Sequence, residues 1–251
     1  MKVKAAVVNQ VNGPYEFEEL DLQEINHDEV VVKVVASGIC HSDEALRVGD
    51  AESPFPAVLG HEGAGIVEQV GSSVKNFKVG DQVVMAYNSC GTCQSCRTGH
   101  PSSCNDWAAL NMGGVRSDRQ PVFKKADGTP VSNFFSQSSF STYTVTNVNN
   151  LIKVSDDADL RIIGPLGCGF LTGAGTVVNG LKPKVGDSIP QFAIPKLIEF
   201  HQQGKFAFDK LVKFYKFDEI NEASADSNSG VTIKPILIID ETYRAGEPLP
   251  S

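Results

Sequence analysis

Four of the six cysteines of the chain lie close together in one segment. Their spacing is C-x2-C-x2-C-x7-C, which can bring four thiolates to a single metal ion. Four sulfur ligands around one ion form the closed tetrahedral arrangement of a structural zinc site. We therefore predict a structural zinc lobe over about residues 88–105, with the ligands Cys90, Cys93, Cys96 and Cys104.

Three other interpretations of this cysteine pattern are open, namely a disulfide framework, an iron–sulfur centre and a redox pair. Disulfide frameworks are typical of short secreted chains. This chain has 251 residues, and Met1–Lys4 leads directly into a strand-like run without the pattern of a signal peptide. Iron–sulfur proteins also use closely spaced cysteines, although with other spacings. The pattern favours zinc over all three.

The composition is that of an ordinary globular protein, with 41% hydrophobic and 21% charged residues. The formal net charge of -8 argues against a nucleic-acid partner, because a phosphate backbone attracts basic surfaces. No apolar run approaches the length that spans a bilayer, so we expect no membrane partner. Metal-binding cysteines fit a reducing compartment, and we expect a cytoplasmic location.

Short runs of β-branched residues, separated by turn residues, occupy the first part of the chain. Val3 to Val8, Phe17 to Leu22 and Val30 to Val35 are typical of strands in a largely antiparallel sheet or barrel. The third run is almost continuously apolar, which predicts burial on both faces. Just after it comes Cys40, which taken alone would be an ordinary buried thiol. Further on, His61 and Glu62 stand between glycines, a pattern that also fits a simple turn.

Together these segments resemble the medium-chain, zinc-dependent alcohol dehydrogenases. Gly60–Gly65 resembles the zinc signature of that family, and Gly38–Asp43 resembles the segment that supplies its first catalytic ligand. Gly167–Gly175 matches the segment with the third ligand, and the four-cysteine loop lies where the family has its structural zinc. These enzymes are the standard example of a catalytic zinc held by two cysteines and a histidine. The resemblance therefore implies a catalytic zinc bound by Cys40, His61 and Cys168.

The resemblance also implies roles for the neighbouring polar residues. Ser42 matches the hydroxyl that accepts the proton of the alcohol, although it could equally cap a helix over Asp43 to Val48. Asp43 resembles the carboxylate that orients the ligand histidine, and Glu62 resembles the acid that can approach the metal. Ala45 stands where horse-liver-type enzymes continue the proton relay with a histidine, so proton exit would need water or another group.

The expected substrate is a small alcohol or aldehyde, and the chain looks closest to the aryl- or benzyl-alcohol branch of the family. Trp107, Tyr87 and Phe135 are candidates for an apolar substrate pocket, with core packing as the alternative role. Residual contacts to NAD, the cofactor of the intact family, would come from His41, Thr172 and Lys234. His41 occupies a position often held by arginine, so it would bind phosphate more weakly.

The cofactor domain of the family is missing from the sequence. Gly186–Asp187 should lead into a strand and the G-x-G-x-x-G fingerprint of a Rossmann domain. Instead the chain continues at Pro190 with residues that resemble sequence from beyond that domain. Gly167–Gly173 has one residue too many for the fingerprint and contains a proposed zinc ligand. We place a deletion junction near residues 188–192 and suspect a rearrangement there.

We therefore expect a mainly β fold with short helices: one GroES-like barrel domain over residues 1–240, a structural zinc lobe, no Rossmann domain, and a flexible tail over 241–251. Residues 105–133 read as a loop and Phe134 to Val145 as a strand. The C-terminal part predicts a helix over Ile194 to Gln203, a second helix capped by Asp218 and ending at Gly230, and a last strand over Ile233 to Ile239.

Three functions are compatible with these features. The first is a catalytic domain that binds two zinc ions but lacks its hydride acceptor, so NAD-dependent turnover is not expected. The second is an active dehydrogenase that binds NAD through the residual contacts. The third is a zinc-stabilised scaffold that self-associates through the surface exposed by the missing domain. We favour the first, because hydride transfer requires a nicotinamide held close to the alcohol carbon.

Overall fold

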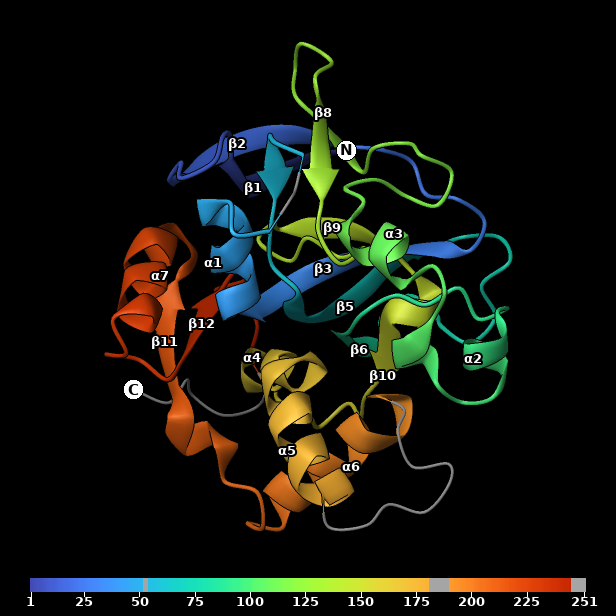
Figure 1. The fold of residues 1–251 in the computed structure, drawn as a ribbon, viewed down its shortest axis with the longest axis vertical. Helices are drawn as coiled ribbons and strands as arrows, with labels where there is room; N and C mark the ends of the chain where they lie inside the picture. The colour runs from blue at the N-terminus through green and yellow to red at the C-terminus, as the bar shows by residue number, and fades with distance from the viewer. Residues whose placement is uncertain (52–53, 181–189, 245–251) are drawn as a thin grey trace.

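The computed structural model describes residues 1–51, 54–180 and 190–244. Figure 1 shows a mainly β architecture in which strands occupy the centre and short helices surround them. Residues 188 and 189 of the expected junction lie outside the described part, as do residues 245–251 of the expected tail. Tyr243, which we expected to be unstructured, packs against the hydrophobic core.

A small closed barrel forms the first layer. Its strand order is β1 (Lys2–Val8), β2 (Tyr15–Leu22), β7 (Phe123–Lys124), β8 (Pro130–Asn133) and β4 (Ala57–Val58). The long β1–β2 pair is antiparallel and aligns Lys2 with Asp21 and Val8 with Tyr15. Both expected strands in this region are confirmed.

The second layer is a seven-stranded sheet built around β3 (Glu29–Gly38). Along the sheet the order is β10 (Leu151–Lys153), β6 (Gln82–Met85), β5 (Glu62–Val70), β3, β12 (Lys234–Ile238) and β11 (Val212–Lys216), while β9 (Tyr143–Asn147) also pairs with β3. All but one residue of β3 are buried, as its continuous apolar run predicts. The last expected strand is confirmed as β12, which lies beside β3.

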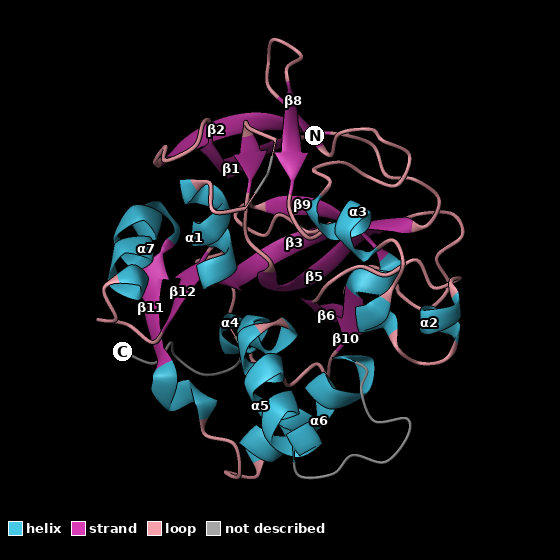
Figure 2. Cartoon of the chain, viewed as in Figure 1, coloured by secondary structure: helices cyan, strands magenta, loops and turns pink. Residues whose placement is uncertain are grey.

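The helices are short and gather around the sheets (Figure 2). On one side α1 (His41–Val48) contacts α7 (Ile220–Asn228), and on another α4 (Leu160–Ile163), α5 (Gly169–Gly180) and α6 (Pro190–Gln202) lie together. The helices α2 (Gln94–Arg97) and α3 (Trp107–Met112) belong to the segment around the cysteine loop. The 3-10 turns are η1 (Pro101–Ser103), η2 (Val148–Asn150), η3 (Gly164–Gly167), η4 (Phe208–Leu211) and η5 (Phe217–Glu219).

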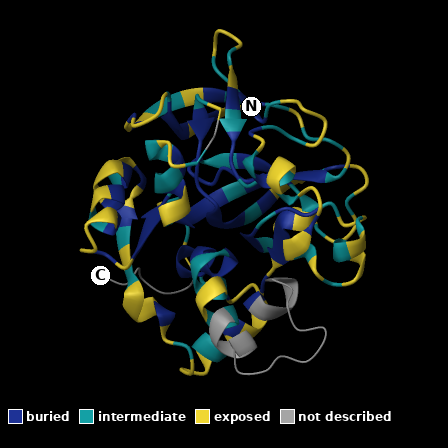
Figure 3. Ribbon diagram, in the orientation of Figure 1, coloured by how far each residue is buried: buried dark blue, intermediate teal, exposed yellow. Residues whose placement is uncertain are grey.

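Many of the buried residues lie on the strands, as the dark blue segments of Figure 3 show. One core fills the barrel and continues to α1 and α7, with Phe140 fully buried and its ring 5.7 Å from that of Tyr15. A second core joins the sheet to α4 and α6 through Leu160, Leu166 and Ile194. Burial of these side chains from water is the main force that holds the helices in place.

Several boundaries differ from the sequence-based expectations. The segment 105–133, expected to be a loop, contains α3, β7 and β8, and the two strands pair with each other and with β2 and β4 of the barrel. The strand expected over Phe134 to Val145 begins only at Tyr143, since the residues before it form a left-handed turn. The helix expected from Ile194 starts at Pro190 and continues through Pro195. Asp218 does not cap α7, because it lies inside the preceding turn η5 and Glu219 takes the cap position.

A buried ion pair joins the first residue of β3 to the segment after α3. Arg116 Nη1 lies 2.9 Å from Glu29 Oε2, and both side chains are only 7% exposed. Removing one member of such a pair leaves a buried charge without compensation.

We expect Arg116→Met to lower the free energy of unfolding by about 3–5 kcal/mol, because the buried carboxyl of Glu29 would lose its partner. Lys2→Met is the matched control, since Lys2 pairs with Asp21 at the surface, where the side chains are 50% and 39% exposed. That variant should change stability by less than about 1 kcal/mol. Chemical denaturation measures both. Equal losses in the two variants would contradict a special role for the buried pair.

Candidate metal centres

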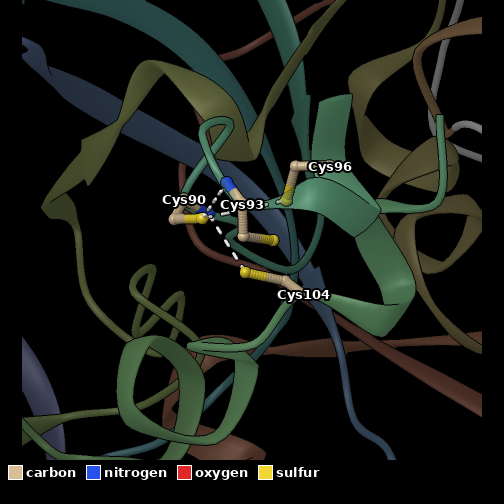
Figure 4. A group of neighbouring side chains, drawn as sticks. All are labelled: Cys90, Cys93, Cys96 and Cys104. Carbon is tan, nitrogen blue, oxygen red and sulfur yellow. Dashed lines mark hydrogen bonds between the residues drawn. The ribbon is translucent and has the colours of Figure 1, made fainter. Parts of the chain in front are cut away.

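The four cysteines of the loop converge on one point, as Figure 4 shows. Their sulfur atoms all lie within 4.8 Å of one another, and Cys90 Sγ lies 3.9 Å from Cys96 Sγ. A zinc–sulfur bond of about 2.3 Å in a tetrahedron predicts a sulfur–sulfur distance of about 3.8 Å. A disulfide would need a separation of about 2 Å, and all six cysteines are free. The loop therefore has the geometry of a four-sulfur metal site.

Backbone groups of the loop point toward these sulfurs. The amide of Cys93 donates to Cys90 Sγ and the amide of Cys90 donates to Cys104 Sγ, both at 3.3 Å. Such bonds stabilise thiolates, which are the form that binds metal. Gly91 and Gly99 have φ values of 70° and 83°, a left-handed conformation that lets the chain reverse on either side of α2.

A second group of ligand atoms lies at the junction of three elements. Cys40 follows β3, His61 immediately precedes β5, and Cys168 lies between η3 and α5. Their ligand atoms and a carboxylate oxygen of Glu62 all lie within 4.8 Å of one another. Cys168 Sγ is 3.3 Å from His61 Nε2, close to the roughly 3.6 Å expected for two ligands of a tetrahedral zinc. The structure thus brings together the three catalytic ligands implied by the sequence.

Asp43 connects two of the three ligand segments. Its Oδ1 accepts from the amide of Gly60 at 2.9 Å and lies 3.0 Å from His61 Nδ1. Its Oδ2 accepts from the amide of Cys40 at 3.0 Å. Bonding at Nδ1 leaves Nε2 of the imidazole available to a metal ion and fixes the direction of the ring. Asp43 thereby has the position expected of the orienting carboxylate.

Charge interactions among the ligands are strong. A hydrogen bond with Cys168 is the main cause that lowers the pKa of Cys40 to about 2, and the same bond, with burial, raises the pKa of Cys168. Burial opposes a positive charge on His61, but the charge and hydrogen bond of Asp43 outweigh it and raise the pKa to about 10. A metal ion that bound these three groups would displace their protons.

Glu62 and Lys234 form a buried ion pair next to the ligands. Lys234 Nζ lies 3.0 Å from both carboxylate oxygens of Glu62, and the amide of Gly169 donates to Oε1 at 3.1 Å. Burial raises the pKa of Glu62 to about 6 against the opposing charge of Lys234. Lys234 also donates to the carbonyl of Ile39. The ammonium that we expected to face a cofactor phosphate is thus engaged inside the protein.

The remaining candidates lie on α1 and α5. Helix α1 begins at His41 with Cys40 in the cap position, so the capping role considered for Ser42 is wrong and its hydroxyl is exposed 3.9 Å from Cys40 Sγ. His41 is exposed as well, and Ala45 is half-buried in the same helix. Thr172 is exposed on α5, and its hydroxyl donates to the carbonyl of Cys168.

Aromatic rings line one side of the second ligand group. The ring of Phe135 lies 4.7 Å from the imidazole of His61, and Trp107 meets Phe135 edge to face at 5.5 Å. Phe134 contacts both His61 and Phe135. Tyr87 instead lies near Ser102 in the cysteine lobe, and burial raises the pKa of its hydroxyl. Two of the three aromatic residues singled out in the sequence therefore lie together near the ligands.

One contact could not be found from the sequence. Gln137 is fully buried, and its amide group donates to the carbonyls of His61 and Ala86 at 2.9 and 3.0 Å. Its carbonyl oxygen accepts from the amide of Gly63 at 3.3 Å. A single glutamine among serines has no spacing that signals this role.

Comparisons with known proteins identify the family. Residues 26–156 match the alcohol dehydrogenase GroES-like domain. A geraniol dehydrogenase from Castellaniella defragrans is 30% identical over 366 aligned positions, which cover 95% of this chain and 98% of that protein. The chain belongs to the medium-chain, zinc-dependent alcohol dehydrogenases, of which it contains the GroES-like catalytic domain. The expected family and fold class are confirmed.

Two further comparisons agree with this assignment. A probable alcohol dehydrogenase from a Pseudomonas species is 46% identical over 158 residues, which cover 62% of this chain and 50% of that protein. The crystal structure of benzyl alcohol dehydrogenase from Acinetobacter calcoaceticus matches with a TM-score of 0.88 and 30% identity, covering 95% of this chain and 99% of that chain. The sequence match to the Pseudomonas protein spans only about half of that protein's length.

The alignment with geraniol dehydrogenase also shows how much sequence is missing. Its 366 positions exceed the 251 residues of this chain by 115, so at least 115 positions have no counterpart here. Among the residues that the structure describes, no helix is long and apolar enough to cross a membrane.

We expect Cys93→Ser to lower the metal content from about two ions per chain to about one and to unfold the cysteine lobe. The reason is that a four-ligand structural site depends on every ligand. Elemental analysis and thermal unfolding measure the two effects. Ser95→Ala is a matched control, since Ser95 lies in the same loop without being a ligand. An unchanged metal content in the Cys93 variant would refute the assignment of this site.

For the second site, we expect Asp43→Asn to lower metal affinity by about 10–100-fold, because an amide cannot accept all three hydrogen bonds of the carboxylate. Competition with a metal chelator gives the affinity. Asp50→Asn is the matched control. It changes an exposed aspartate just beyond α1 and should leave the metal affinity unaltered. Equal affinities in the two variants would show that Asp43 does not orient His61.

Proposed function

We propose that this chain is the catalytic domain of a zinc-dependent alcohol dehydrogenase that binds one structural and one catalytic zinc. The observation that carries the proposal is that all six cysteines and one buried histidine form two ligand sets of the right chemistry and spacing. Neither set has a surplus or missing cysteine. A protein that used these thiols only for packing would have no reason to place them in two such groups.

The catalytic set would hold a small alcohol or aldehyde. When bound, zinc supplies Lewis-acid chemistry that favours loss of the alcohol proton. Ser42, exposed beside Cys40, would accept that proton, and without a histidine at Ala45 the proton would leave through water. Asp43 holds the imidazole of His61 in the required tautomer. Glu62 lies within reach of the metal position as a reserve ligand.

An aromatic or otherwise unsaturated alcohol fits the surroundings best. Phe135 packs on the imidazole of His61 and Trp107 meets Phe135 edge to face, and such rings favour flat apolar groups. Relatives whose names refer to geraniol and benzyl alcohol support this substrate class.

NAD-dependent turnover is not expected from this chain alone. A Rossmann domain takes on the order of 100–150 residues. Here α5 ends at Gly180 and α6 starts at Pro190, so nine residues separate them. The alignment with geraniol dehydrogenase has at least 115 positions without a counterpart in this chain, which is enough for such a domain and supports its loss. The proposed oxidoreductase chemistry would then lack its hydride acceptor.

Two alternatives have some support. Residual NAD binding through His41, Thr172 and Lys234 is disfavoured because the ammonium of Lys234 is already paired with Glu62. A self-associating scaffold is favoured by Val231 and Ile233, which are 71% and 70% exposed in one loop. For either function we propose a cytoplasmic location, because metal-binding thiols require a reducing environment.

Titration of the zinc-loaded protein with NADH, followed by nicotinamide fluorescence, tests the central point. We expect no saturable binding, since the surface that would hold the cofactor is reduced to isolated contacts. An intact relative with its Rossmann domain provides the positive control. Saturable binding that Lys234→Met weakens would overturn the proposal and support the residual-contact alternative.

A further inference from the structure

A strained turn lies between the two ligand groups. Within Phe134–Ser138, three residues other than glycine have positive φ: Phe135 at 52°, Ser136 at 50° and Ser138 at 45°. L-residues in this left-handed conformation cost about 1–2 kcal/mol each. Strain of this kind persists only where surrounding contacts hold the backbone in place. The contacts of this turn therefore indicate what it positions.

One side of the turn holds the segment of the histidine ligand. Phe135 lies against the imidazole of His61, at 4.7 Å between ring centroids. The Gln137 side chain donates to the carbonyl of His61 and accepts from the amide of Gly63. The turn thus fixes both the ring and the backbone of His61.

The other side of the turn is bonded to the cysteine lobe. The amide of Phe135 donates to the carbonyl of Asn111 at 2.8 Å, and Ser136 Oγ donates to the carbonyl of Leu110 at 2.6 Å. Both acceptors lie in α3, directly after the loop. Ser136 Oγ also accepts from Asn88 Nδ2 at 3.2 Å.

The bonds continue toward the cysteines. The side chain of Asn111 accepts from the amide of Asn88 at 2.7 Å and donates to the carbonyl of Asn88 at 2.9 Å. Cys90 follows two residues later, so one short path of hydrogen bonds leads from the loop to the turn. Both Asn111 and Asn88 are buried, where such bonds compete little with water.

We propose that the turn Phe134–Ser138 couples the two metal sites, so that metal in the four-cysteine loop raises the metal affinity of Cys40, His61 and Cys168. Ser136 and Gln137 are the positioning residues of this coupling. The inference rests on the proposed binding of metal by both ligand groups, and it adds that they do not load independently.

The physical reason lies in the strain of the turn. A filled loop holds α3 and Asn88 in place, and their hydrogen bonds keep Ser136 left-handed. With the loop empty, these bonds weaken and the turn can relax to a less strained conformation. Phe135 and Gln137 then withdraw from His61. By linkage, metal at the second site strengthens binding at the loop by the same factor.

Cobalt(II) titration of the full chain tests the coupling, because thiolate-bound cobalt absorbs strongly and the two ligand sets differ in their spectra. We expect affinity at the second site to be about tenfold lower in Cys90→Ser/Cys93→Ser, in which the loop cannot fill, than in the unsubstituted chain. Circular dichroism checks that the sheets remain folded.

Ser136→Ala tests the path without altering any ligand. This variant removes the bonds to Leu110 and Asn88, and we expect it to lower affinity at the second site by about tenfold while the loop still fills. Ser224→Ala is the matched control, because Ser224 is also buried and hydrogen-bonded but lies on α7. Gln137→Leu should act like Ser136→Ala, with Gln82→Leu as its control on β6, where the side-chain amide donates to the carbonyl of Asp156.

The outcomes separate two kinds of failure. If both sites bind cobalt but neither the empty loop nor Ser136→Ala changes affinity at the second site, the coupling is wrong and the proposed function stands. If no cobalt reaches either ligand group in the unsubstituted chain, the proposed function itself fails. A stability loss in Ser136→Ala with unchanged affinity would show that the turn is only structural and would also overturn the coupling.

Discussion

The hydrogen bonds of the Asp43 carboxylate are the interaction on which the geometry of the second ligand group depends. The carboxylate lies fully buried at the start of α1 and accepts hydrogen bonds from the backbone of Cys40 and Gly60 and from the ring of His61. These groups come from segments about twenty residues apart that meet only because β3 and β5 are neighbours. An uncompensated carboxylate at this depth would be costly, so the three donors and the charge stabilise one another.

Different parts of the fold position the two ligand groups. The seven-stranded sheet brings Cys40, His61 and the ion pair of Glu62 with Lys234 to one end of neighbouring strands. The segment after β10 adds Cys168 through the turn η3. The cysteine lobe is linked to this ligand group by hydrogen bonds from α3 and Asn88 to the turn at Phe135. A local motif thus forms one ligand group, whereas the other requires nearly the whole domain.

That division explains how much the sequence could predict. The cysteine loop is local, so its ligands follow from spacing alone, and the second ligand set followed from resemblance to a family. The apolar runs of the sequence predicted the main strands β1, β2, β3 and β12. Gln137 and the left-handed conformation at Ser136 were not, because long-range hydrogen bonds impose them on residues with no such preference. The same holds for Lys234, whose pairing with Glu62 depends on two strands that are far apart in sequence.

The position of β12 beside β3 bears on how the domain is made. Gly38 pairs with Ile236, and the carbonyl of Pro235 accepts from the amide of Ile39, next to the ligand Cys40. The ribosome makes the chain from the N-terminus, so β3 can pair with β12 only after almost the entire chain has been synthesised. Contacts between such distant residues slow folding. The cysteine loop can therefore fold early. The ligand group of Cys40, His61 and Cys168 assembles late, after the ribosome has made nearly every residue.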